Sequence, residues 1–155
     1  MNDPKEIPQY YYYSDWSLNS RGFLKCGFKC GMWFEYHKNG KLKSMVTYSK
    51  GVKNGYCAYY DQNEIIETFG NYVNDVHCGL WAYYHYGTNI MESFGEYVNG
   101  MKQGLWTSYH FNGRIRELGS YVDNVKIKLW TTYHENGSLA SIGNYLNGNY
   151  DGQWS

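Results

Sequence analysis

The sequence of 155 residues has little proline, no net charge and no long apolar run. Only 2 prolines occur, and 14 basic residues balance 14 acidic ones. No stretch approaches the roughly 20 apolar residues that cross a bilayer as a helix, so we expect no transmembrane helix. Balanced charge argues against specific nucleic-acid binding, because phosphate contacts need a basic excess.

The N-terminus is polar and reads MNDPKEIPQ. It lacks the apolar stretch that a signal peptide requires, and it predicts a short arm over residues 1–9 of an intracellular, cytoplasmic protein. A membrane-peripheral or virion location stays open. The length predicts a single domain over residues 10–155.

Aromatic residues are abundant, at 20% of the chain with 19 tyrosines among them. Mean hydropathy is nevertheless low, at −0.67. Burial must therefore come mainly from Tyr and Trp, which suit pleated, half-wet surfaces better than a thick dry core.

A repeat of 24 or 25 residues organises the chain, which we find by aligning the sequence with itself. Its markers are Trp33, Cys57 in the place of a tryptophan, Trp81, Trp106, Trp130 and Trp154. A glycine stands two places before each marker except at Lys128, and a second glycine column in the later part of each unit is broken only by Val46. The units lie near 10–32 (partial), 33–56, 57–80, 81–105, 106–129 and 130–155.

Each unit predicts two strands joined by turns. Asn-Gly pairs such as Asn39-Gly40, Asn112-Gly113 and Asn136-Gly137 predict two-residue hairpin turns, because Asn-Gly supplies the positive φ that these turns need. Further pairs at 99–100 and 147–148 end the second strands. The one 25-residue spacing predicts a longer turn near residues 86–89. Alternation places Trp81, Tyr83 and His85 on one face of their strand.

The unit GLWTSYHFNGRIRELGSYVDN at 104–124, with its relatives starting at Gly31, Gly79 and Lys128, resembles the MORN-variant repeat of bacterial YwqK-type antitoxin proteins. The resemblance covers roughly residues 22–154. It implies an all-β fold, an elongated single twisted antiparallel sheet of about 12 strands built from successive hairpins. MORN-type repeats also occur in membrane-tethering and cytoskeletal scaffolds and in large DNA viruses.

Four histidines share one repeat position, which suggests a metal ladder: His37, His85, His110 and His134, with Asp61 in the gap. Equivalent positions in neighbouring repeats are about 9 to 10 Å apart, too far to share one zinc ion. We therefore interpret the column as polar residues before a turn, with their tips in water, and expect no metal site.

The four cysteines are Cys26, Cys30, Cys57 and Cys78. Cys26 and Cys30 straddle a predicted turn without a second pair at ligand spacing, so they predict no zinc site. We expect four reduced thiols, with Cys57 a small packed apolar residue.

Motifs of catalysis are missing from the sequence, which has no Gly-x-Ser-x-Gly, no His-Glu-x-x-His and no phosphate-binding glycine loop. We expect no enzyme, no catalytic residue and no cofactor. The aromatic columns fit a structural role, in which rings on neighbouring strands stabilise the sheet, and are also compatible with a protein-binding surface.

Charge is segregated along the chain. Residues 21–55 carry eight basic side chains and one acidic one, and residues 56–101 carry six acidic side chains and no basic one. The basic segment is the candidate partner-binding site, through Arg21, Lys25, Lys29, Lys38, Lys41, Lys43, Lys50 and Lys53. Its partner would be an anionic protein surface, the acidic band of a second copy, or anionic lipid headgroups.

The sequence therefore predicts a non-enzymatic repeat module for protein–protein interaction or scaffolding, with an aromatic, charge-banded surface. Two alternatives stay open. One is an antitoxin or immunity protein that neutralises a toxin, and the other is a peripheral membrane-tethering or virion structural component.

Overall fold

The computed structural model describes residues 4–155, and every regular element in this part is a β-strand. The strands are β1 (Ile7–Tyr12), β2 (Leu18–Lys25), β3 (Phe28–Tyr36), β4 (Leu42–Ser49), β5 (Val52–Tyr60), β6 (Ile66–Val73), β7 (Val76–Tyr84), β8 (Met91–Val98), β9 (Met101–Tyr109), β10 (Ile115–Val122), β11 (Val125–Tyr133), β12 (Leu139–Leu146) and β13 (Asn149–Asp151). They form one antiparallel sheet in chain order, which confirms the predicted fold class with thirteen strands.

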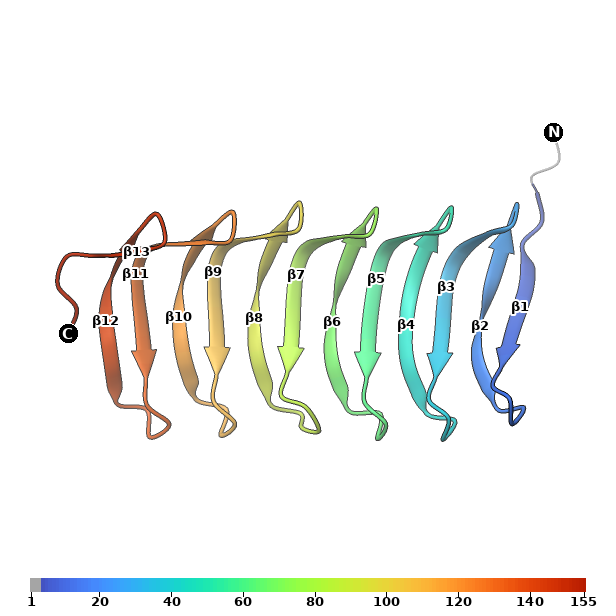
Figure 1. The fold of residues 1–155 in the computed structure, drawn as a ribbon, viewed down its shortest axis with the longest axis horizontal. Helices are drawn as coiled ribbons and strands as arrows, with labels where there is room; N and C mark the ends of the chain where they lie inside the picture. The colour runs from blue at the N-terminus through green and yellow to red at the C-terminus, as the bar shows by residue number, and fades with distance from the viewer. Residues whose placement is uncertain (1–3) are drawn as a thin grey trace. The chain divides into compact units, whose positions relative to one another are not determined.

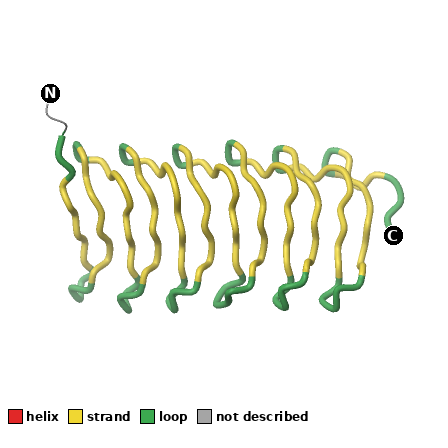
Figure 2. Tube along the Cα trace, turned by 180° about the vertical axis from the view of Figure 1, so that it is seen from behind, coloured by secondary structure: helices red, strands yellow, loops and turns green. Residues whose placement is uncertain are grey.

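The chain divides into two compact units, residues 1–76 and 77–155. We call them unit 1 and unit 2. Unit 1 holds β1 to β6, and unit 2 holds β7 to β13, apart from the first residue of β7. Within each unit, successive strands are joined by hairpin loops at their two ends (Figures 1 and 2). Residues 7–9 of the predicted arm belong to β1, and residues 1–3 lie outside the described part.

The hairpin loops are of two kinds. Two-residue loops such as 99–100 have positive φ at both residues, 50° at Asn99 and 78° at Gly100, as type I′ turns require. At the other end of the strands the loops are longer. The predicted two-residue turn at Asn39-Gly40 is wrong, because a five-residue loop joins Tyr36 to Leu42 and only Gly40 in the pair has positive φ.

The same correction holds at Asn112-Gly113 and Asn136-Gly137, where five residues also separate the strands. The loop between β7 and β8 has six residues, 85–90, which confirms that the extra residue of the 25-residue spacing is absorbed at this turn.

Buried tryptophans are the largest side chains of the core. In unit 2, Trp106 and Trp130 are only 4% and 2% exposed. The ring of Trp130 lies flat against Gly119, on the neighbouring strand, and its Nε1–H donates to the carbonyl of Ser120 at 3.3 Å. Side chains at the glycine position would overlap the indole, so the second glycine column exists to make room for the tryptophan column.

Val46 and Cys57 depart together from this pairing of glycine with tryptophan. These two residues lie directly opposite each other on β4 and β5, where other repeats have glycine and tryptophan. Both are buried, with Val46 4% and Cys57 0% exposed. A tryptophan at position 57 would need glycine at position 46. Because cysteine is smaller than tryptophan, there is room for the valine side chain, and the two residues pack against each other.

Candidate interaction surfaces

The histidine column links consecutive repeats through the backbone. The Nε2–H groups of His37, His85 and His110 donate to carbonyl oxygens 23 or 24 residues further along, at 3.0, 3.0 and 2.8 Å. A carbonyl only accepts, so this contact fixes the tautomer of each ring. The interpretation of the tips as water-exposed is therefore wrong for these three histidines, of which His85 is only 7% exposed. It holds for the fourth, His134, which is exposed.

Asp61, which takes the histidine position in the remaining unit, accepts hydrogen bonds from the backbone of Asn63 and Ile65 through Oδ1. No group of three or more His, Cys, Asp or Glu that could hold a metal ion occurs within residues 4–155. All four cysteines are free thiols, and burial raises the pKa of Cys57 to about 11.

The five-residue loops are also tied to each other. Asn39 Oδ1 accepts from the backbone of Lys41 at 3.1 Å, and its Nδ2 donates to the carbonyl of Gln62 in the next loop at 2.8 Å. Asn112 makes the same two bonds in unit 2, to Arg114 and Glu135. The asparagine thus shapes its own loop and anchors the next one, which holds these loops in a defined row.

We call the side of each unit's sheet that carries the buried tryptophans, such as Trp33 and Trp106, the tryptophan face. Two of the eight predicted basic residues lie over aromatic rings on this face. Lys29 Nζ is 4.3 Å from the ring centroid of Trp33 and 4.9 Å from that of Tyr48. Lys53 Nζ is 4.9 Å from the ring of Tyr72, a residue whose pKa burial raises to about 12. These cation–π contacts make Lys29 and Lys53 part of the packing.

Arg21 also contacts aromatic side chains. Its guanidinium carbon lies 4.8 Å from the ring centroid of Phe34, and its Nε donates to the hydroxyl of Tyr36 at 2.8 Å. Lys25 ends β2 just before the two-residue loop 26–27, and Lys50 is the first residue of the loop 50–51. Both line an open groove of about 710 Å³ that Cys26 and Phe28 also line.

Lys38, Lys41 and Lys43 lie at the opposite end of the strands, in and beside the five-residue loop 37–41. We call these three residues the basic loop cluster. Lys38 and Lys43 line a hollow of about 360 Å³, together with Tyr13. Strand β3 has nine residues, so about 25 to 30 Å of strand separates this cluster from Lys25 and Lys50. The eight residues therefore do not form one patch.

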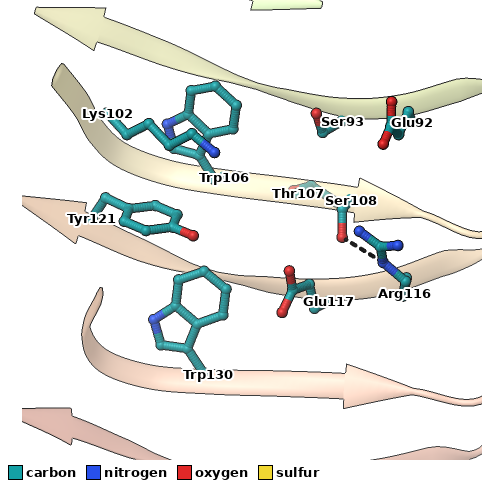
Figure 3. A pocket seen from close by; sticks show the side chains of 10 residues that line it. All are labelled: Glu92, Ser93, Lys102, Trp106, Thr107, Ser108, Arg116, Glu117, Tyr121 and Trp130. Carbon is teal, nitrogen blue, oxygen red and sulfur yellow. Dashed lines mark hydrogen bonds between the residues drawn. The ribbon is translucent and has the colours of Figure 1, made fainter. Parts of the chain in front are cut away.

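A second hollow, of about 200 Å³, lies in unit 2 on the tryptophan face (Figure 3). Two serines, Ser93 and Ser108, are directly paired across β8 and β9 at this place. Charged side chains surround them. The full lining is Glu92, Ser93, Lys102, Trp106, Thr107, Ser108, Arg116, Glu117, Tyr121 and Trp130. Sequence reasoning missed this site, although serine in a position held by tyrosine in two earlier units was a readable signal.

The fold and these surfaces define a β-hairpin repeat protein in which, within each unit, hydrogen bonds link consecutive repeats. Three segments, 29–50, 102–123 and 127–147, match the model of the MORN repeat variant and together cover less than half of the chain. MORN repeats are commonly modules for binding proteins or membranes, and they are generally non-enzymatic.

No curated protein matches the sequence. Among solved structures, a chain of the GtfA/B complex bound to UDP and GlcNAc aligns with a TM-score of 0.29 at 12% identity. The alignment covers 73% of this chain and 22% of that one, so this protein spans about a fifth of the length of its match. None of the described residues belongs to a helix that could span a membrane.

Proposed function

We propose that this protein is a non-enzymatic interaction module, and that unit 1 binds an anionic surface of a partner protein through the basic loop cluster. The observation that carries the proposal is the placement of Lys38 and Lys41 on one loop that is anchored to the next, with Lys43 beside it at the start of β4. A pre-ordered loop loses little conformational entropy when a partner binds.

The cluster keeps its positive charge available. Within residues 4–155, neither Lys38 nor Lys43 has an ion-pair partner, and both are exposed. Lys41 Nζ donates to the carbonyl of Asn63 at 3.5 Å, a contact that orients the ammonium without neutralising it. Three like charges at one end of the strands attract an anionic surface and increase its association rate.

The other five basic residues of the predicted site have a smaller part in this proposal. Arg21, Lys29 and Lys53 serve the packing of the sheet through ring contacts. Lys25 and Lys50 lie at the far end of the strands, so a partner seated on the cluster leaves them untouched.

Binding to a toxin, as the antitoxin resemblance implies, is the special case in which the anionic partner is a toxin. Pairing with the acidic segment 56–101 of a second copy uses the same chemistry. Anionic lipid headgroups are a different kind of partner, which the experiment separates from a protein.

The test is the capture of partners from the native source, followed by measured affinities at about 0.05 M and about 0.3 M salt. We expect affinity to fall as salt rises, and Lys38→Glu, Lys41→Glu and Lys43→Glu together to remove binding. The double change Lys25→Glu and Lys50→Glu is the control at the other end and should retain it.

Undiminished capture by the triple variant would refute the role of the cluster. Binding to vesicles with anionic lipid, in the absence of any protein partner, would replace the protein surface by a membrane.

A further inference from the structure

The hollow of unit 2 exists because a ring is missing from one row of side chains. Tyr83 lies two residues after Trp81, and its ring stacks on the Trp81 ring on the same face of the sheet, with 6.0 Å between the centroids. Ser108 takes the same place one repeat later. The short side chain leaves about 200 Å³ of space over β9, between taller neighbours (Figure 3).

One side of the hollow is built around Ser108, which is 7% exposed. Arg116 Nε lies within hydrogen-bond distance of Ser108 Oγ, at 3.3 Å, and donates to it. This bond holds the guanidinium at the rim (Figure 3). The terminal amino groups of Arg116 have no partner among residues 4–155, and they form a fork of donors that suits a carboxylate.

The other side of the hollow holds the ammonium group of Lys102, and the Glu117 carboxylate is near enough to act on it electrostatically. Lys102 Nζ lies 4.2 Å from the ring centroid of Trp106 and 5.3 Å from that of Tyr121. In the described part of the chain no carboxylate is within ion-pair distance of it, whereas Glu117 pairs with Lys126 at 3.3 Å. Partial burial lowers the pKa of Lys102, and the negative charge of Glu117 offsets only part of this shift, so a further hydrogen-bond acceptor beside the ammonium would stabilise its charged form.

Hydroxyl-binding groups complete the lining. Ser93 Oγ lies opposite Ser108 on the neighbouring strand, and Glu92 contributes a carboxylate at the edge (Figure 3). Serine hydroxyls donate and accept hydrogen bonds, and a carboxylate accepts them from ligand hydroxyls. The hollow is smaller than the pockets of about 300 to 1,000 Å³ that hold drug-sized ligands.

We propose that this hollow binds a small hydroxylated carboxylate of the size of one sugar ring, such as a sugar acid. Arg116, on one side of the hollow, binds the carboxylate, and Lys102, Ser93, Ser108 and Glu92 bind the hydroxyl groups. This site lies wholly within unit 2 and does not depend on the basic loop cluster of unit 1.

The probe is glucuronate, added to the full chain with amide resonances recorded by NMR. We expect saturable shifts at residues of the hollow, with glucose and acetate at least tenfold weaker. Glucose lacks the carboxylate, and acetate lacks the hydroxyls. No saturable shift with glucuronate would overturn the proposal. Equal binding of glucose or of acetate would overturn the role of the missing group.

Variants locate the binding. Ser108→Tyr restores the ring that Tyr83 has in the previous repeat, so it should fold and abolish glucuronate binding. Glu35→Tyr, at the same repeat position in unit 1, is the control and should bind normally.

Arg116→Gln and Lys102→Met each should weaken binding at least tenfold. Arg116 is exposed at the rim, so its replacement tests the site even if Ser108→Tyr fails to fold. Unchanged binding in folded Arg116→Gln or Ser108→Tyr protein would show that glucuronate binds elsewhere.

Discussion

The contact between Gly119 and the ring of Trp130 is the tightest point of unit 2 that a single substitution can probe. An alanine Cβ at position 119 would lie 2.1 Å from Cδ2 of Trp130, whereas real Cβ atoms essentially never approach within 3.0 Å. The ring cannot simply retreat, because Trp130 is 2% exposed and the edges of Tyr121 and Tyr145 are packed against it.

Gly119→Ala therefore combines two losses. Overpacking a filled site costs about 1 to 3 kcal/mol. Displacing the indole also weakens the hydrogen bond from Trp130 Nε1 to the Ser120 carbonyl, which is a loss of about 1 kcal/mol. Alanine also lowers the conformational entropy of the unfolded chain relative to glycine, which stabilises the folded protein by about 0.5 kcal/mol. We expect the free energy of unfolding to fall by about 2 to 3 kcal/mol.

The assay is urea unfolding followed by tryptophan fluorescence, with Gly104→Ala as the control. Gly104 has a φ of +64°, and an alanine Cβ there meets no atom within 4 Å. Gly104→Ala thus adds backbone strain without a clash, for about 1 kcal/mol. If Gly119→Ala costs no more than Gly104→Ala, the steric reasoning is refuted.

Two further predictions concern the positions that depart from the repeat. Cys57→Trp should destabilise the protein by about 1 to 3 kcal/mol because the indole meets Val46, and adding Val46→Gly should recover at least about 1 kcal/mol. A double-mutant cycle by urea unfolding measures this coupling, and strictly additive effects would contradict the paired exchange. Lys128 has a φ of +59° where other repeats have glycine, so Lys128→Gly should stabilise the protein by about 0.5 to 1 kcal/mol. Lys128→Ala keeps the strain, so a thermal melt showing equal gains for both variants would disprove this cause.

The turns show how far local sequence reasoning reaches. Asn-Gly at 99–100 forms a two-residue turn at the predicted end of a second strand, but Asn39-Gly40 forms part of a five-residue loop. The dipeptide is the same in both places. At Asn39 the amide bonds to Gln62, 23 residues away, and this contact with the next loop lies outside any local pattern.

The contacts of the histidines and lysines at the candidate sites also depend on residues that only the fold brings together. Spacing placed His110 in a column, but the acceptor of its Nε2–H is a backbone carbonyl that becomes a neighbour only when the next repeat folds against it. Counting charges grouped Lys29 with Lys38, yet Lys29 lies over the rings of Trp33 and Tyr48. Charge counts carry no information on which end or face of a strand a side chain occupies.

The sequence by itself determined the all-β hairpin array, its repeat period and the antiparallel order of successive strands. These features rest on alternation, turn glycines and repeat spacing, which act over a few residues at a time. Only the tertiary structure showed that the ring of Trp130 packs on Gly119 and that Val46 pairs with Cys57. It also showed that the short side chain of Ser108 leaves a hollow. Each of these depends on the register between neighbouring strands, which brings together side chains that are ten or more residues apart.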